Sequence, residues 1–342
     1  MRSETNSFNF PFSHIYVEEE IRDHELTKGI LSRFSKSVEI PIRHYKDVFN
    51  RPHQSFRLQK SAPSLILARS KGSQIYKGAP VCQDFGFDHF YYTSSVMNCI
   101  FDCEYCYLRG MYGSGNVVVF VNLEHTFSEL EELLKLHPVY LCVSFDTDLI
   151  GLESLTGFVD RWVEFTRTHE NLTIEIRTKS FRKDIYDKTP SCERVIFAYT
   201  ISPQAIIDKF EKRTASLTER LVAASRAIEK GFTVRLCFDP VIYTKNWKDL
   251  YSSMFLEVTK YIDGHQLKDV SIGSFRISAE YIKKLRSDFP ASEICQFPYE
   301  NRGGYMQYPQ ELQNEMEKHV FTLLQSFISE DKIYMTDYIE KA

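Results

Sequence analysis

Three cysteines stand so close together in the chain that their type and spacing indicate a bound metal or an iron–sulfur cluster. Cys99, Cys103 and Cys106 form the pattern C-x3-C-x2-C, and no fourth cysteine follows nearby. Three thiolates at this spacing can bind three irons of a [4Fe-4S] cluster and leave one iron open. A structural zinc would need a fourth Cys or His close by, and the next cysteine, Cys142, falls in an expected strand. The spacing therefore favours the cluster over zinc or buried free thiols.

The composition is that of an ordinary globular protein. The chain has 342 residues, of which 43% are hydrophobic and 26% are charged. Its 42 Lys and Arg residues stand against 46 Asp and Glu residues, so the net charge is −4 and any contact with nucleic acid must use a local basic patch. The sequence has neither 18 consecutive apolar residues nor the pattern of a signal peptide. We therefore expect a cytoplasmic protein with no membrane contact, whose eight cysteines form no structural disulfides.

Apolar runs of strand length alternate with amphipathic helical segments through the middle of the chain. Such βα units predict a parallel sheet or barrel, with the chemistry at the C-terminal ends of its strands. The expected strands are 90–93, 117–122, 140–145, 172–178, 195–202, 233–242 and 269–275, and the expected helices include 127–136, 156–168 and 217–231.

We expect three regions along the chain. Residues 1–87 form a mixed α/β extension, with strands at 14–17, 38–42 and 64–68 and a helix at 24–34. Residues 88–290 form the barrel-like region, and residues 291–342 form a loop or hairpin followed by a helix at 311–327. The three cysteines fall directly after the first strand of the barrel-like region, where a catalytic loop belongs.

The cysteine pattern in this context resembles the radical S-adenosylmethionine superfamily, in which an aromatic residue precedes the last cysteine, as Tyr105 does here. The resemblance implies a partial TIM barrel of about six βα units and two cofactors, a [4Fe-4S] cluster and S-adenosylmethionine. In that superfamily the open iron binds S-adenosylmethionine, and an electron from the cluster cleaves it to a 5′-deoxyadenosyl radical. Many members carry Gly-Gly-Glu about forty residues later, where this chain has Ser-Phe-Asp-Thr-Asp at 144–148.

Longer stretches are similar to the spore photoproduct lyase family, whose members reverse the 5-thyminyl-5,6-dihydrothymine lesion in spore DNA. The similarity implies a carbon–carbon lyase that repairs DNA and in which Tyr105, Asp146, Lys179 and Thr200 bind the cofactor. The matching stretches are CEYCYL at 103–108, DTDLIGLESLT at 146–156, RTKSF at 177–181, YTIS at 199–202 with IIDKFE at 206–211, and GFTVRLCFDPVIYTKNW at 231–247.

The resemblance also implies a cysteine that donates hydrogen. The deoxyadenosyl radical takes hydrogen from C6 of the lesion, the methylene bridge breaks, and a thiol quenches the thymine radical that remains. In the best-known branch of the family this thiol follows the third strand, where the present chain has Phe145. Cys142 lies three residues earlier, so strand alternation predicts that it faces away if Phe145 faces inward. Cys82, in a loop signal before the first barrel strand, is the favoured donor, since some relatives place a thiol upstream of the cluster.

Two tyrosines flank the last cluster cysteine. Tyr105 and Tyr107 resemble the family's tyrosine pair, which passes the radical back from the thiyl sulfur to 5′-deoxyadenosine, so that a hydrogen atom returns to the thiol. In the other interpretation these two aromatic rings only exclude solvent from the cluster. The same kind of alternative holds for Lys179, which could be a solvated charge at the end of a strand.

The segment YENRGGYMQY at 299–308 corresponds to the hairpin with which the lyases extrude the lesion from the duplex, although it is shorter and less basic. Arg302 and Tyr305 are its candidate DNA contacts, because extrusion of a base needs aromatic support. The expected partners are DNA that contains spore photoproduct and an external one-electron reductant. We expect a monomer in the cytoplasm, or in the spore core if the organism sporulates.

Two other functions stay open. A radical enzyme of the same fold could act on a different substrate, which Phe145, the weak hairpin and the negative net charge favour. A non-catalytic iron–sulfur or zinc protein could instead bind nucleic acid, and it would not cleave S-adenosylmethionine.

Overall fold

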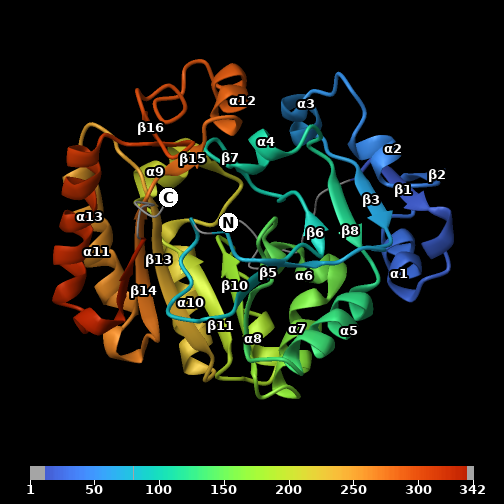
Figure 1. Cartoon of the computed structure of the whole chain (residues 1–342), viewed down its shortest axis with the longest axis horizontal. Coiled ribbons are helices and arrows are strands. Elements are labelled where there is room, and N and C mark those ends of the chain that lie inside the picture. The colour runs from blue at the N-terminus through green and yellow to red at the C-terminus, as the bar shows by residue number, and fades with distance from the viewer. Residues whose placement is uncertain (1–11, 80, 337–342) are drawn as a thin grey trace.

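The computed structural model describes residues 12–79 and 81–336, and its largest feature is an eight-stranded sheet. Its strands are β4 (Ile75–Lys77), β5 (Phe90–Thr93), β9 (Val139–Cys142), β10 (Leu172–Thr178), β11 (Val195–Thr200), β13 (Thr233–Val241), β14 (Asp269–Ser274) and β18 (Ile333–Met335). They follow one another in the order β18-β14-β13-β11-β10-β9-β5-β4, and all neighbours are parallel except β4 and β5. The carboxyl ends of the parallel strands therefore meet at one edge (Figure 1).

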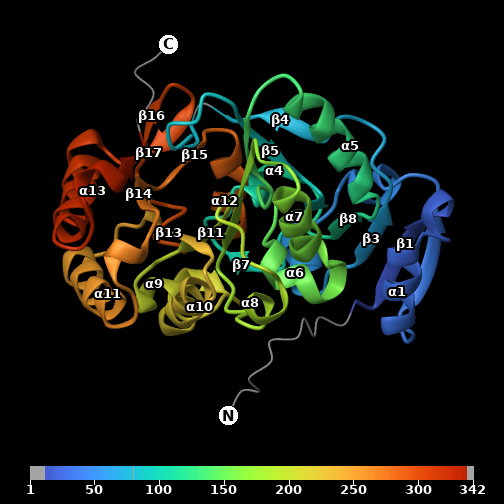
Figure 2. The same ribbon diagram turned by 90° about the horizontal axis from the view of Figure 1, so that it is seen from below.

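Helices cover the outer face of this sheet, which Figures 1 and 2 show from two directions. They are α5 (Leu123–Leu134), α6 (Leu149–Thr156), α7 (Phe158–Arg167), α8 (Ile185–Lys188), α10 (Leu217–Glu229), α11 (Trp247–Tyr261) and α13 (Gln310–Gln325). The ends of α10 show why a helix forms there. Ser216 and Glu219 form a capping box at its start, and Gly231 takes a positive φ of 78° just beyond its end.

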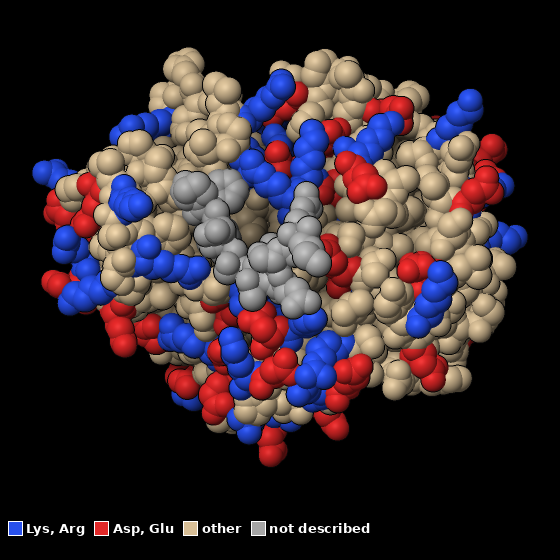
Figure 3. All heavy atoms as spheres, turned by 180° about the vertical axis from the view of Figure 1, so that it is seen from behind, with Lys and Arg blue, Asp and Glu red and all other residues tan. Residues whose placement is uncertain are grey.

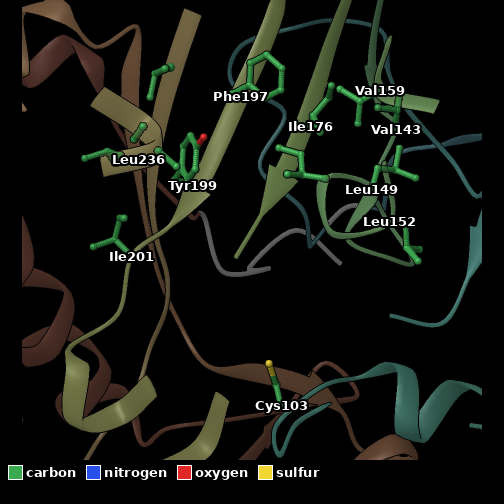
Figure 4. Packing of buried hydrophobic residues seen from close by; sticks show 14 of the residues in the cluster. Cys103, Val143, Leu149, Leu152, Val159, Ile176, Phe197, Tyr199, Ile201 and Leu236 are labelled. Carbon is green, nitrogen blue, oxygen red and sulfur yellow. The ribbon is translucent and has the colours of Figure 1, made fainter. Parts of the chain in front are cut away.

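The strands are buried on both faces. Side chains such as Leu141, Ile176 and Phe197 pack in the main hydrophobic core, and Figure 4 shows part of this packing. The opposite face of the same strands carries the buried polar residues Glu175 and Arg235. Apolar runs in strands that are buried in this way are nearly continuous, which is why the sequence identified these strands.

A second sheet joins the N-terminal region to the barrel-like region. Its strands are β1 (His14–Glu18), β2 (Val38–Ile42), β3 (Leu65–Ala68), β6 (Val96–Met97) and β8 (Val117–Phe120), in the order β2-β1-β3-β8-β6. The helices α1 (Glu25–Arg33), α2 (Lys46–Phe49) and α3 (Phe56–Ser61) belong to the same part of the chain. Strand β8 pairs with β3 here, whereas β4 extends the larger sheet. Both sheets thus contain strands from either side of residue 87.

The C-terminal part forms a small sheet beyond the strand ends. It consists of β15 (Arg276–Ser278), β16 (Glu300–Arg302) and β17 (Tyr305–Gln307), with α12 (Tyr281–Asp288) between the first two. Gly303 and Gly304 form the tip of the hairpin with φ of 57° and 86°, which glycine adopts readily. The described residues include no helix that is long and apolar enough to cross a membrane.

Candidate active site at the ends of the strands

The three cysteines lie in a loop beyond the carboxyl ends of the parallel strands. The loop includes β7 (Asp102–Cys103) and leads into α4 (Leu108–Met111). Strand β7 pairs with β12 (Glu211–Lys212), which follows α9 (Gln204–Phe210), so that Cys103 lies opposite Glu211. Asn98 begins the loop with a positive φ of 69° and donates two hydrogen bonds, to the carbonyls of Ser114 and Asn116. In Figure 4, Cys103 stands apart from the other core residues and its sulfur points toward the strand ends.

The donor set fits an iron–sulfur cluster. Burial raises the pKa of Cys99, and raises that of Cys103 to about 12, so both thiols need a strongly positive partner to ionise. Among residues 12–79 and 81–336, no three His, Cys, Asp or Glu side chains converge closely enough to hold a single metal ion. The three thiols therefore do not have the geometry of a tetrahedral zinc site. A cluster does not require such convergence, because each thiolate binds a different iron.

A buried charged network lies beside Cys103. Lys179, which follows β10 directly, donates from Nζ to Tyr105 Oη over 2.6 Å and to Glu211 Oε1 over 3.1 Å, and lies 4.0 Å from Cys103 Sγ. Tyr105 donates to Glu211, which also binds the fully buried Arg220. Burial alone would raise the pKa of Glu211, but the charges of Arg220 and Lys179 outweigh it and lower this pKa. Glu211 is therefore a carboxylate.

Thr200 belongs to the same group. It ends β11 and is 3% exposed, and its carbonyl accepts a hydrogen bond of 3.0 Å from Arg220 Nη1. The structure thus brings Tyr105, Lys179 and Thr200 together around the Glu211–Arg220 pair. The sequence analysis missed this pair, although Glu211 ends the matching stretch IIDKFE.

Asp146, the fourth expected cofactor residue, lies in a separate hydrogen-bonded group. Its carboxylate accepts from Ser94, from Tyr112 over 2.9 Å and from Tyr107 over 3.3 Å. The Tyr107 hydroxyl also donates to the Phe145 carbonyl over 2.6 Å. Burial raises the pKa of Asp146, and the three hydroxyl groups oppose this shift. Ser94 and Tyr112 were not expected from the sequence.

The loop that carries Cys82 is fixed over the interior of the larger sheet. Arg276 donates from Nε and Nη2 to the Val81 carbonyl, over 3.2 and 3.0 Å, and Gln83 donates to the Met335 carbonyl over 2.8 Å. Phe85 lies with its ring 3.1 Å from the Arg235 guanidinium. Burial raises the pKa of Cys82, so its thiol retains its hydrogen at neutral pH. An ionised Cys82 would raise the pKa of Tyr92 and that of Tyr107.

Cys142 does not face away as the strand alternation predicted. It lies two residues after Tyr140, whose hydroxyl donates to Glu175 over 2.6 Å inside the sheet. The pKa of Cys142 is raised first by burial and then by Glu175, and Cys82 also contributes. The prediction was wrong because β9 ends at Cys142, so its alternation does not extend to Phe145.

Phe145 and the Cys142 thiol therefore belong to the same region. The ring of Phe145 stacks on Tyr92 with centroids 4.1 Å apart, and Tyr92 lies opposite Cys142 in the pairing of β5 with β9. Cys142 is 9% exposed, whereas Cys82 is only partly buried. Accessibility, and not the direction of the strand face, distinguishes the two thiols.

The C-terminal hairpin uses its arginine internally. Arg302 donates to the side-chain oxygens of Gln310 and Gln313 and, over 2.9 Å, to the Tyr308 carbonyl. The structure therefore places Arg302 at the junction between the hairpin and α13. Tyr305 is half-buried at the other side of the turn. Figure 3 shows one face of the molecule, on which several Lys and Arg side chains gather beside a hollow, while charges of both signs are scattered among uncharged residues elsewhere.

A thiol loop at the carboxyl ends of parallel strands, with a lysine and a threonine at the ends of two of them, is the arrangement expected of a radical S-adenosylmethionine enzyme. The family model for spore photoproduct lyase matches residues 10–336. The chain therefore belongs to the spore photoproduct lyase family.

Known relatives agree with this assignment. The chain is 23% identical over 177 residues to a spore photoproduct lyase of Geobacillus sp. (strain Y412MC61), and the match covers 51% of this chain and 52% of the relative. This chain thus spans about half the length of that relative. A solved spore photoproduct lyase complexed with dinucleoside spore photoproduct has a TM-score of 0.82 at 20% identity, over 96% of this chain and 99% of that chain.

A second solved structure is a cysteine-to-alanine and serine-to-cysteine variant of spore photoproduct lyase with bound AdoMet and dinucleoside spore photoproduct. It has a TM-score of 0.81 at 19% identity and covers 96% of this chain and 99% of that chain. At these identities the likeness shows the fold, and the expected partial TIM barrel is confirmed.

Proposed function

We propose that this protein is a radical S-adenosylmethionine lyase that converts spore photoproduct in DNA to two thymines. The observation that carries the proposal is the position of the thiol loop, whose Cys103 lies 4.0 Å from the Lys179 ammonium at the strand ends, in a chain of this family. Lys179 offers a positive charge where a carboxylate ligand would bind. The two similar solved structures that contain dinucleoside spore photoproduct support the same substrate.

The site residues form two groups, one for the cluster and one for S-adenosylmethionine. Cys99, Cys103 and Cys106 would hold three irons of a [4Fe-4S] cluster. When bound, the cluster and S-adenosylmethionine supply a 5′-deoxyadenosyl radical, which takes hydrogen from C6 of the lesion. The residues proposed to bind S-adenosylmethionine are Tyr105, Asp146, Lys179 and Thr200.

Cys82 is the proposed hydrogen donor. Its thiol is protonated, partly accessible and carried by a fixed loop, so it can give one hydrogen atom to the thymine radical after the methylene bridge breaks. The resulting thiyl radical would take a hydrogen atom from the Tyr107 phenol, Tyr107 would take one from Tyr105, and Tyr105 would recover one from 5′-deoxyadenosine. Burial raises the pKa of both tyrosines, so both phenols carry the hydrogen that such a relay needs.

The proposed partners are lesion-containing DNA and an external one-electron reductant. We further propose a monomer that works in the cytoplasm, or in the spore core of a sporulating organism. Tyr305 remains the candidate DNA contact of the hairpin. Arg302 supports this role less, because its guanidinium is already bound to α13 and to the Tyr308 carbonyl.

Because the Arg302 guanidinium is bound within the protein, a second candidate function remains, a radical enzyme of the same fold that acts on another substrate. A hairpin whose only arginine is bound internally offers few contacts to phosphate groups. The two candidates share the cluster and the cofactor and differ in the product.

The test is turnover of a dinucleotide spore photoproduct. The protein is reconstituted anaerobically with iron and sulfide and incubated with dithionite and S-adenosylmethionine, and 5′-deoxyadenosine and thymidylyl-thymidine are measured together. Both products support the lyase. Deoxyadenosine without repair supports the second candidate, and neither product from cluster-loaded protein overturns both.

Three cysteine variants then identify the donor. C82A should still form deoxyadenosine while the lesion radical is diverted to side products. C192A is the matched control, because Cys192 is a buried cysteine just before β11, at the opposite end of that strand from Thr200. Normal repair by C82A together with lost repair by C142A would assign the donor to Cys142 instead.

A further inference from the structure

Lys60 is a buried lysine that faces the cysteine loop from the N-terminal region. It lies in α3, is 5% exposed, and its ammonium donates a hydrogen bond to the Cys99 carbonyl. Burial lowers the pKa of Lys60, whereas negative charge on Cys99, Cys106 and Asp102 acts in the opposite direction and Arg109 lowers it further. Lys60 is thus part of the surroundings of two cluster cysteines, although more than thirty residues separate it from them in the sequence.

No carboxylate among the described residues forms an ion pair with Lys60. Asp102, a carboxylate that acts on it, is itself bound to the buried Arg109. Lys179, on the other side of the loop, differs in this respect because it is paired with Glu211. A buried ammonium is unfavourable unless an opposite charge faces it. The groups that could provide this charge are the thiols of Cys99 and Cys106, which are thiolates when they bind iron.

The backbone around Lys60 packs closely against the segment that follows the cysteine loop. Arg213 donates to the Lys60 carbonyl over 3.1 Å, and the Gln59 side chain accepts from the Gly115 amide over 2.9 Å. A Cβ atom at Gly115 would lie 2.9 Å from the backbone nitrogen of Lys60 and 2.6 Å from the carbonyl oxygen of Phe56. Only glycine permits this contact, so the chain holds α3 against the segment that follows the cysteines.

We infer that Lys60 is the counter-charge of the iron–sulfur cluster and raises its reduction potential. The inference rests on the proposed function, because it requires the cluster to be bound at Cys99, Cys103 and Cys106. Reduction adds one negative charge to the cluster, and a positive charge in a medium of low polarity stabilises the reduced form more than the oxidised form. Lys60 would therefore make the cluster easier to reduce through its positive charge, without touching the substrate.

The test compares midpoint potentials of reconstituted protein, measured by anaerobic redox titration with electron paramagnetic resonance. K60M removes the charge and keeps an apolar stem, and K60Q removes the charge but keeps a donor for the Cys99 carbonyl. Both variants should lower the midpoint potential by at least about 59 mV, which corresponds to a tenfold change in the equilibrium constant for transfer of one electron. K60R should stay near the parent.

K212M is the matched control. Lys212 lies on β12 opposite Asp102, but its side chain is 54% exposed and pairs with Glu104. Its removal should leave the potential unchanged, because water screens an exposed charge. If K60M and K60Q bind the cluster and keep the parent's potential, the inference is wrong. If K60M does not fold, K60Q and K60R decide the question, and a parent protein that binds no cluster would overturn the proposed function as well.

Discussion

The buried carboxylate of Glu211 offers the sharpest test of how the active site is held together. It accepts from Tyr105, from Lys179 over 3.1 Å, from Ser202 over 3.0 Å and from Arg220. The side chains of Glu211 and Arg220 are both 0% exposed. The substitution E211Q keeps the shape of the side chain, removes its charge and places an amide where Lys179 and Arg220, which can only donate, need an acceptor.

The expected loss of stability follows from the burial of the partners. Breaking a buried ion pair by removing one partner costs about 3 to 5 kcal/mol, because the other charge is left unpaired. The matched control is E293Q, since Glu293 pairs with Lys209 over 2.8 Å but both side chains are more than half exposed. An exposed pair contributes about 0 to 1 kcal/mol. The two variants should therefore differ by about 3 kcal/mol.

The difference in unfolding free energy between the parent and E211Q should also depend on pH. The pKa of Glu211 is lowered by folding, so its charge stabilises the fold above the pKa of an unfolded glutamate, about 4.3, and this contribution is lost as the pH falls toward the lower folded value. The gap between the parent and E211Q should be complete at neutral pH and shrink below about pH 4.

The assay is urea unfolding followed by circular dichroism, with the parent, E211Q and E293Q prepared in the same iron-loaded state. The unfolding free energies are compared at neutral pH and at several acidic values. The reasoning is refuted if E211Q loses no more stability than E293Q, or if its deficit does not change between neutral and acidic pH.

Two further predictions concern the neighbouring segments. R302A should lower the free energy of unfolding by about 1 to 3 kcal/mol, because Gln313 and two other acceptors lose a charged donor. Binding of undamaged duplex DNA, measured by fluorescence anisotropy, should change little. Unchanged stability together with weaker DNA binding would contradict this prediction. G115A should lower the free energy of unfolding in urea by about 1 to 3 kcal/mol, because the new methyl group meets the Lys60 backbone. The control G113A, with no atom within 4 Å of its added Cβ, should change this free energy by no more than about 0.5 kcal/mol. Equal losses in the two variants would contradict the prediction.

The sequence predicted most strands of the larger sheet but not their arrangement with the N-terminal region. The expected strand at 172–178 matches β10 exactly in its bounds, since its run of apolar residues is long. Strand β18 was missed because it is only three residues long. Residues 117–120 form the expected strand, yet they pair with β3, since a four-residue apolar run specifies burial and not the neighbouring strand.

The cysteine loop could be predicted because its ligands are close together in the sequence. The Glu211–Arg220 pair could not, because the position of Glu211 opposite Cys103 depends on the pairing of β7 with β12, two segments more than a hundred residues apart. A glutamate directly after a short helix is usually a solvated charge. The same limit explains the error on Cys142, since the residue at which β9 ends is a tertiary property and not a property of its apolar run.

The two tyrosines beside Cys106 show how a short sequence interval can serve two different sites. Tyr105 binds Glu211 and accepts from Lys179, whereas Tyr107 donates to the Phe145 carbonyl and to Asp146. One phenol thus lies with the lysine that would bind the cofactor, and the other lies with Phe145 and Asp146. In the proposed relay, a hydrogen atom would cross from the first group to the second, and Cys106 is the residue between the two tyrosines in the sequence. In the proposed relay, the hydrogen-bond partners of the two tyrosines support Tyr105 as the member on the cofactor side and Tyr107 as the member on the other side, with Cys82 as the proposed final acceptor.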